Sequence, residues 1–277
     1  MDNLDKGLQY LSHCGIQKYL EDALVQLLKA REIDCSIYSR CFLTNYFGHV
    51  RSGSHTILRE YSYISATPYN RVAFLLNIWK CYQGMEKRIM TVEEFYVLIQ
   101  LLCPDFPQSI MRRTRRTIET NCGRKEWHAF GQLYRIFQFH VFYEEFVNAL
   151  TAQTHYSTPL GDSQKMAGKF KPNQEAGGSL ETIETGASSE SRYVQTDFEE
   201  STTQLCLESI ITTQNFKRFV PSLFAQQKFP LPGRQILRTC TKELFLEATI
   251  NLDKLFYALV NENKLWEEVG LPWIPER

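Results

Sequence analysis

The sequence predicts an all-α protein, and three observations support this prediction. Apolar residues recur at spacings of three and four along most of the chain, which is the period of one face of an α-helix. The alternation of apolar and polar residues that is typical of strands is nowhere sustained. Of the 277 residues, 43% are hydrophobic and 13% are aromatic, which is enough for a well-filled core and too apolar for a disordered protein.

The composition divides the chain into two helical blocks and a linker. Residues 10–151 are expected to form a helical domain, in which a hairpin at 16–47 precedes further helices at 71–150. Residues 152–197 are rich in Ser, Thr, Gly, Gln, Glu and Lys and predict a long disordered linker, because such a segment buries too little apolar surface to offset its ordering entropy. The C-terminal helices, within 198–277, are expected to pack on the first domain.

The hairpin has one wide apolar face. Its first helix carries a stripe made of Ile16, Leu20, Ala23, Leu24, Leu27 and Leu28. Ser36 is placed to cap the second helix, and Gly48 with the polar stretch to Ser54 is expected to end it. The second helix contributes Ile37, Cys41, Phe42 and Phe47 to the apolar face.

This apolar pattern also resembles a known module. Tyr19-Leu20-x-x-Ala23-Leu24-x-x-Leu27-Leu28 followed by Phe42-x-x-x-Tyr46-Phe47 is similar to the dimerisation/docking hairpin of the regulatory subunit of cyclic-AMP-dependent kinase. The resemblance implies that two hairpins pair and present a groove for an amphipathic partner helix. The candidate partner-binding residues are Leu20, Leu24, Leu27, Leu28 and Phe42. An ordinary hairpin at the edge of the core is the alternative.

Further helices follow along both blocks. Thr91 and Glu94 form a capping box at the start of one of them, and Pro104 prevents its continuation beyond Leu102. The apolar spacing predicts the remaining helices at Ile110–Glu119, Trp127–Leu150, Leu205–Phe219, Arg234–Glu247 and Leu252–Asn261.

Two segments have the outline of helix–loop–helix calcium hands, at Tyr82–Glu93 and Thr120–Gly131. Ile89 and Trp127 are taken as the central apolar residues of the two loops. A calcium loop needs Asp at its first position, Gly at the sharp turn and several oxygen ligands between them. The first segment fits only at its last position, Glu93, and the second fits worse. We therefore expect degenerate EF-hand-like helix pairs that do not bind calcium.

Charge and motif content exclude several classes of function. The chain has 31 Lys and Arg against 31 Asp and Glu, which argues against a general nucleic-acid binder. No secretory signal or membrane span is expected, so we predict a soluble cytoplasmic protein with its eight cysteines reduced.

No phosphate loop, nucleophile elbow or metalloprotease motif is found. One group could look metal-like, but its spacing is too irregular for a zinc module: Cys35, Cys41, His49 and His55. We expect no catalytic residue, no cofactor and no metal site.

Four arginines fall within five residues, namely Arg112, Arg113, Arg115 and Arg116. At about 100° per residue they cover roughly 160° of a helix, opposite an apolar side. The guanidinium fork can bond both oxygens of a carboxylate, so an acidic partner is one interpretation of this face. A solvated helix surface is another. Nucleic acid is a weaker third, because no stacking aromatics interleave with the arginines.

The C-terminal tail is unusually apolar and contains Trp266 and Trp273. Buried aromatic residues often dominate interface energies, so both indoles are candidate anchors on a partner. They could equally fold back on their own domain, because exposed tryptophan is seldom tolerated.

Several longer phrases of the sequence are not generic helix patterns: Tyr19-Leu20-Glu21-Asp22-Ala23, Gln26-Leu27-Leu28, Arg59-Glu60-Tyr61-Ser62-Tyr63, Ala66-Thr67-Pro68-Tyr69-Asn70-Arg71-Val72 and Leu101-Leu102-Cys103-Pro104-Asp105-Phe106-Pro107. They resemble the centriolar satellite-associated tubulin polyglutamylase complex regulator family. The resemblance covers residues 15–150 well and Leu205–Leu259 more loosely. The linker and the tryptophan-containing tail depart from the family.

The resemblance implies a non-catalytic regulator or scaffold subunit, found with centriolar satellites, the centrosome and microtubules. Its partners would be subunits of the tubulin polyglutamylase complex, and the arginine face would meet acidic tubulin tails or an acidic subunit. Glutamate ligation would belong to a separate ATP-dependent subunit, so no catalytic residue is carried over.

Other hypotheses stay open beside this one. The hairpin alone would serve as a docking or anchoring module for amphipathic helices of kinase-anchoring or ciliary proteins, and it is compatible with a homodimer. An unrecognised enzyme that uses cysteine and histidine is the third hypothesis. Neither nucleic acid nor a membrane is an expected partner.

Overall fold

The computed structural model describes residues 15–154 and 209–272. Within these residues the fold is all-α, as predicted. The twelve described α-helices are α2 (Ile16–Ile33), α3 (Ser39–Ser52), α4 (Tyr61–Ser65), α5 (Pro68–Tyr82), α6 (Val92–Gln100), α7 (Gln108–Cys122), α8 (Phe130–Phe142), α9 (Glu144–Thr154), α10 (Thr213–Gln226), α11 (Arg234–Thr241), α12 (Leu252–Val260) and α13 (Asn263–Val269). Short 3-10 helices are η1 (Ser54–Thr56), η2 (Gln83–Met85) and η4 (Leu244–Leu246). Most of the expected linker, residues 155–197, lies outside the described residues.

Four short strands form two antiparallel pairs in the described part of the chain. These pairs are β1 (Ile89–Met90) with β2 (His128–Ala129), and β3 (Ile210–Thr212) with β4 (Thr249–Asn251). Each strand leads directly into a helix, namely α6, α8, α10 and α12 in that order. The strands therefore tie neighbouring helix–loop–helix units together in pairs.

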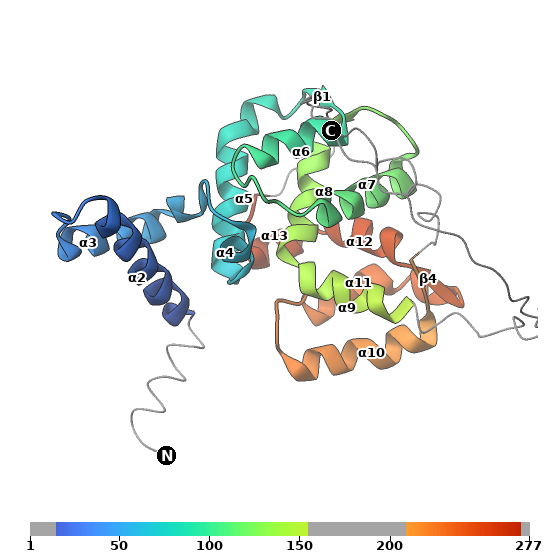
Figure 1. The fold of residues 1–277 in the computed structure, drawn as a ribbon. Helices are drawn as coiled ribbons and strands as arrows, with labels where there is room; N and C mark the ends of the chain where they lie inside the picture. The colour runs from blue at the N-terminus through green and yellow to red at the C-terminus, as the bar shows by residue number, and fades with distance from the viewer. Residues whose placement is uncertain (1–14, 155–208, 273–277) are drawn as a thin grey trace, which may run out of the picture.

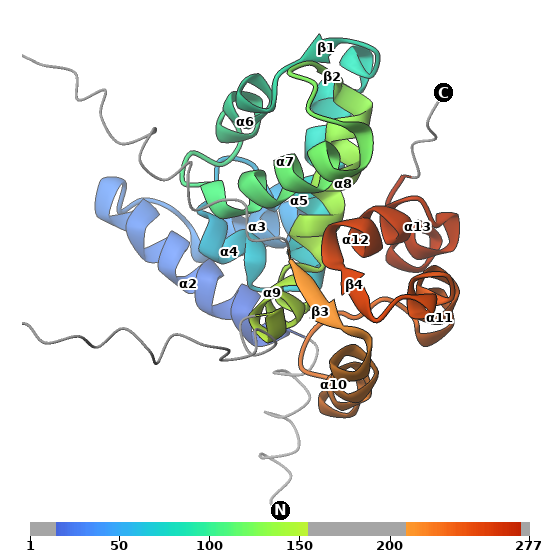
Figure 2. The same ribbon diagram turned by 90° about the vertical axis from the view of Figure 1, so that its right-hand side faces the viewer.

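Helix α8 forms the centre of the fold. All of its residues except Gln132 are buried, including the polar Arg135, Gln138 and His140, so the helix is covered on every side by other elements. Helices α5, α6, α7, α9 and α12 pack against it, and Figures 1 and 2 show it between the N-terminal elements and the red C-terminal helices. Phe139 of α8 lies 5.7 Å from Phe256 of α12, ring centre to ring centre. One hydrophobic cluster thus includes residues from both blocks.

The first strand pair shifts the expected loop centres by one residue. Met90 pairs with His128, and both side chains are buried, whereas Ile89 and Trp127 are exposed. Successive side chains of a strand point to opposite faces, so a shift of one residue exchanges the inner and outer sets. The expectation that Ile89 and Trp127 are the central loop residues is therefore wrong. The Thr91 capping box is present as predicted and fixes the start of α6.

The second strand pair has the same construction. Ile211 lies opposite Ile250, and both are fully buried. The N-cap of α10 is Thr212, whose hydroxyl accepts from the Asn215 amide. The N-cap of α12 is Asn251, whose side chain accepts from two first-turn amides. The C-terminal block thus repeats the strand-to-helix arrangement of the first block.

Three expected helices differ from the observed ones. The segment Trp127–Leu150, expected as one helix, is divided into β2, α8 and α9, with a break at Tyr143 (φ −100°, ψ 29°). Helix α9 continues to Thr154, past the expected start of the linker at residue 152. The β-branched run at 210–212 forms β3 instead of a helix, as its strand propensity favours. The helix expected at Arg234–Glu247 ends at Thr241, before η4 and β4.

The hairpin of α2 and α3 projects from the rest of the molecule (Figure 1). It has a small core of its own, centred on Tyr19, Ala23 and Tyr46. Ser36 does not cap α3, because its amide and hydroxyl both bond to the Asp34 carboxylate at 2.9 and 2.6 Å. Helix α3 instead starts at Ser39, continues through Gly48 and ends at Ser52 with Gly53 as its C-cap, inside the polar stretch expected to end it. At Gly53 φ is 77°, a left-handed conformation that favours glycine.

Candidate functional site

The apolar face of the hairpin is divided between a buried part and an exposed part. Leu27 is buried and Phe42 packs against the hairpin core. Leu20, Leu24 and Leu28 are 42%, 56% and 64% exposed. These three leucines recur every four residues and form one stripe of α2, which we call the outer hairpin face. The helical stripe seen in the sequence is therefore wider than the surface that the fold covers.

Ionic and aromatic contacts hold the hairpin to the body. Arg59 donates to both carboxylate oxygens of Asp22, at 3.0 and 2.5 Å. The Tyr46 hydroxyl donates to the same carboxylate at 2.6 Å. The Arg59 guanidinium also lies 3.8 Å from the centre of the Tyr63 ring, a cation–π contact. These contacts fix the direction in which the outer hairpin face points.

A second group of contacts lies beside the first. The Tyr19 hydroxyl donates to Asn70 at 2.7 Å and contacts Thr67 at 3.0 Å. The His55 imidazole contacts the same Asn70 oxygen at 2.9 Å and stacks on Tyr69. The residues between Arg59 and Val72, which carry part of the family resemblance, therefore form the socket of the hairpin.

Burial and pairing set the ionisation of this junction. Burial by itself would raise the pKa of Asp22, but hydrogen bonds from Arg59 and Tyr46 and the charge of Arg59 hold that pKa below its ordinary value. The pKa of the Tyr46 hydroxyl is raised above its ordinary value, first by burial and second by the hydrogen bond to Asp22. Burial lowers the pKa of His55. The Asp22–Arg59 ion pair is therefore maintained at neutral pH, beside a neutral imidazole.

The expected arginine face is largely used inside the fold. Arg113 donates to Asn148 at 2.6 Å and lies 3.7 Å from Glu144, both on α9. Arg115 forms an ion pair with Glu93 of α6. The sequence pattern could not indicate this, because these partners come from elements distant in the sequence.

Arg116 joins the two blocks. Its Nε donates to Asp253 of α12 at 2.8 Å, and it also bonds to Ser209. Thr117 donates to the other Asp253 oxygen at 3.2 Å and contacts His140 Nε2 at 2.9 Å. Burial raises the pKa of Asp253, and Arg116 opposes that rise. This cluster links α7, α8 and α12.

Arg112 is the exposed member of the four arginines. Within residues 15–154 and 209–272 it forms no ion pair, in contrast to Arg113, Arg115 and Arg116. The arginines lie opposite the buried side of α7, as predicted, but three of the four are engaged within the fold, and a partner for this face stays a prediction.

Of the two tryptophans predicted as candidate partner anchors in the tail, one lies within the described residues. Trp266 is fully buried in α13, and its indole nitrogen donates to the Val260 carbonyl at 2.8 Å. Such burial leaves no face of the indole for a partner, so this residue folds back on its own domain. Trp273 lies outside the described residues.

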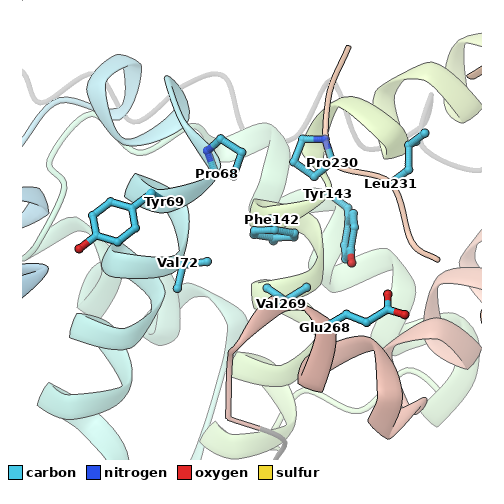
Figure 3. Close-up of a pocket in the computed structure, with 9 residues that line it drawn as sticks. All are labelled: Pro68, Tyr69, Val72, Phe142, Tyr143, Pro230, Leu231, Glu268 and Val269. Carbon is cyan, nitrogen blue, oxygen red and sulfur yellow. The ribbon is translucent and has the colours of Figure 1, made fainter. Parts of the chain in front are cut away.

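A groove of about 410 Å³ lies between the blocks (Figure 3). Figure 3 shows Phe142 near its centre, with Glu268 as the charged group of its lining. It is lined by Pro68, Tyr69, Val72, Phe142, Tyr143, Pro230, Leu231, Glu268 and Val269. This lining suits an apolar or aromatic group and offers no nucleophile with an adjacent base.

The loops and the Cys/His group do not form a metal site in the described structure. With Met90 as the central residue, the first loop starts at Gln83 and ends at Glu94, whose carboxylate is used to cap α6. Neither this loop nor its partner gains the oxygen ligands that calcium needs. Among residues 15–154 and 209–272, no group of three His, Cys, Asp or Glu side chains is arranged to hold a metal ion.

None of the described helices is both long and apolar enough to cross a lipid bilayer.

The hairpin is also the part of the chain that matches a family model. Residues 6–53 match the CSTPP1 N-terminal domain. Over 147 residues the chain is 37% identical to centriolar satellite-associated tubulin polyglutamylase complex regulator 1 of Homo sapiens and of Mus musculus. Over 146 residues it is 36% identical to the same protein of Danio rerio. The resemblance to this regulator family is confirmed.

The match is partial on both sides. It covers 52% of this chain and 44% of each of these relatives, so the chain matches less than half the length of the regulators. The relatives' name describes a regulator of a tubulin polyglutamylase complex at centriolar satellites. No solved structure matches the chain.

The residues of the hairpin socket carry part of the family resemblance, but sequence reasoning did not predict their contact with the hairpin, and it missed a further exposed feature. Lys87-Arg88 and Arg124-Lys125 lie in the two loops joined by β1 and β2, each close to an exposed apolar residue. The two basic pairs were visible in the sequence. Their placement on either side of one strand pair was not, because it depends on the pairing of two loops about forty residues apart in the chain.

Proposed function

We propose that the chain is a non-catalytic regulatory subunit that helps to assemble or localise the tubulin polyglutamylase complex on microtubules and centriolar satellites. The outer hairpin face would supply its contact with another subunit. The observation that supports this most directly is that three exposed leucines lie within the segment that matches the family model. The relatives' name supplies the complex.

The chemistry of the outer hairpin face suits a helical partner. Leu20, Leu24 and Leu28 present one apolar stripe that an amphipathic helix can cover. Full burial of a leucine side chain contributes about 1.5–3 kcal/mol. Three such side chains on an element fixed by the Arg59–Asp22 ion pair can therefore dominate a contact of moderate affinity.

The test replaces all three leucines by glutamine in the tagged full-length chain. Glutamine keeps helix propensity and removes the apolar stripe. We expect recovery of polyglutamylase subunits from cells to fall by at least about tenfold, since loss of such a contact costs more than 1.4 kcal/mol. A matched control replaces Val97 of α6 and Leu101, its C-cap residue, which are 56% and 60% exposed, and should recover the complex normally.

Two results would contradict this proposal. One is an unchanged recovery of the complex by the triple variant. The other is that the unsubstituted chain recovers no tubulin-modifying subunit under conditions that preserve other complexes. Circular dichroism and thermal unfolding of both variants show whether the fold is retained.

The same leucine stripe supports a second candidate function, a docking module for amphipathic helices of kinase-anchoring or ciliary proteins. Fluorescence anisotropy with labelled amphipathic helices tests whether a partner helix binds this face. Light scattering tests whether a second copy of the chain covers it in a homodimer. We do not assign acidic tubulin tails to the α7 arginines, because Arg113, Arg115 and Arg116 are engaged within the fold.

A further inference from the structure

The paired loops at β1 and β2 expose an apolar centre. Met90 lies opposite His128 with both side chains buried, so the alternate residues face outward. Ile89 and Trp127 are 63% and 52% exposed. Trp127 lies two residues from Ala129, the cross-strand partner of Ile89. That makes it a diagonal neighbour of Ile89, at a distance that an aromatic ring can span.

Basic side chains flank this centre. Lys87 and Arg88 precede β1, Arg124 and Lys125 lie just before β2, and all four are exposed. Because the strands are antiparallel, the two basic pairs lie toward opposite ends of the strand pair. No other residue of the described ranges forms an ion pair with any of the four. We call this set the tip surface: Lys87, Arg88, Ile89, Arg124, Lys125 and Trp127.

The carboxylates near the tip surface offset only part of its charge. Glu93 forms an ion pair with Arg115, whereas Glu94 keeps its negative charge while it caps α6. Glu86 and Glu126 also lie in the loops, so the four basic residues outnumber three carboxylates. The tip surface therefore combines an excess of positive charge with an exposed indole.

We propose that the tip surface binds an acidic polypeptide segment that carries an apolar or aromatic side chain. Guanidinium and ammonium groups on both sides would bind carboxylates, while Trp127 would provide the apolar anchor. Single-stranded nucleic acid is less suited, because it requires successive stacking aromatics and the tip offers one. An anionic bilayer would also press against the carboxylates of Glu86 and Glu126, which repel its headgroups.

This contact does not rest on the proposed function of the hairpin. Figure 2 shows β1 and β2 at the top of the molecule, whereas α2 lies lower and to the left. The hairpin contact is apolar, and the tip contact depends on charge. The leucine substitutions therefore test the hairpin contact and the tip substitutions test the tip contact. Either proposal can be overturned without affecting the other.

The test measures fluorescence anisotropy of a fluorescein-labelled peptide made of glutamates around one phenylalanine, added to the full chain. We expect binding that weakens steeply between low and physiological salt, as a contact between exposed charges should. Trp127→Ala should raise the Kd about tenfold, as loss of an aromatic anchor does. Lys87→Gln with Lys125→Gln should raise the Kd and flatten its salt dependence. These side chains are exposed, so thermal unfolding should stay unchanged.

A charge-matched control separates the tip surface from bulk charge. Arg112→Gln with Lys242→Gln removes two exposed cations elsewhere and should leave the Kd unchanged. An equal loss in this control would overturn the proposal, as would an absence of peptide binding. Equal binding of the same peptide with glutamine in place of glutamate would also overturn it. Oligothymidylate or phosphatidylserine vesicles that bind more tightly than the peptide would assign the surface to nucleic acid or to a membrane instead.

Discussion

Arg59 and Asp22 join the hairpin to the body by two hydrogen bonds of 3.0 and 2.5 Å. The hairpin core itself is small, so its orientation depends strongly on this pair. Tyr46 from α3 donates to the same carboxylate. Asp22 is therefore the point at which both hairpin helices and the segment before α4 meet, and it controls how the outer hairpin face is presented.

The first prediction concerns Asp22→Asn. This change removes the charge that binds Arg59 while keeping the size of the side chain. A hydrogen bond to a charged group contributes about 1.5–3 kcal/mol, so we expect local opening of α2 and α3 to become easier by about 2 kcal/mol. Amide hydrogen exchange should accelerate in the hairpin and stay unchanged in α8. Glu21→Gln, at an exposed neighbouring carboxylate, is the control. Equal acceleration across the whole chain would contradict a local role.

The second prediction is a pH dependence of the same junction. The pKa of Asp22 is lowered in the folded protein, so its contribution to stability is complete above the ordinary aspartate value of about 4. It is lost as the pH falls through the lower folded value. The difference in hairpin opening between the natural chain and Asp22→Asn should be constant near neutrality and shrink below about pH 4. Hydrogen exchange corrected for intrinsic rates measures it, and a difference that grows on acidification would refute the assignment.

Local sequence signals predicted the elements that depend on local physics. The Thr91–Glu94 capping box and the stripe of α2 follow from spacing within one helix. The strands at 89–90 and 128–129 have no such signal, because two-residue strands exist only through their pairing. The helical period predicts that four arginines share one side of α7. It contains no information on which carboxylates of other elements form ion pairs with them. The hairpin was thus predictable as a structural element, whereas the tip surface required the register of β1 and β2.

The third prediction tests the junction between the blocks. Arg116→Ala leaves the buried Asp253 carboxylate without its cation, which costs about 3 kcal/mol for a buried pair. The melting temperature should fall by roughly 6–12 °C at 2–4 °C per kcal/mol. Asp253→Asn in the same chain should restore part of the loss, because a neutral amide carries no unpaired charge. Arg112→Ala should change stability by less than about 0.5 kcal/mol.

The pH profile of Arg116→Ala gives an independent check. Burial raises the pKa of Asp253, and loss of Arg116 should raise it further. A group with a raised folded pKa favours folding below its unfolded value, and that advantage is lost as the pH rises through the folded value. The defect of Arg116→Ala should therefore be larger at pH 7 than at pH 4. A defect that is independent of pH would show that the charge of Asp253 is not its cause.

The last prediction concerns Trp266 as a core residue. Trp266→Ala removes a fully buried indole and should cost about 3–5 kcal/mol. Trp266→Phe keeps a ring but loses the 2.8 Å hydrogen bond to the Val260 carbonyl, so it should cost less, about 1–3 kcal/mol. Urea unfolding followed by circular dichroism measures both without relying on tryptophan fluorescence. Trp127→Ala is the matched control, because its exposed indole should contribute little to folding. Similar unfolding midpoints for Trp266→Ala and Trp127→Ala would mean that Trp266 is an outward anchor after all.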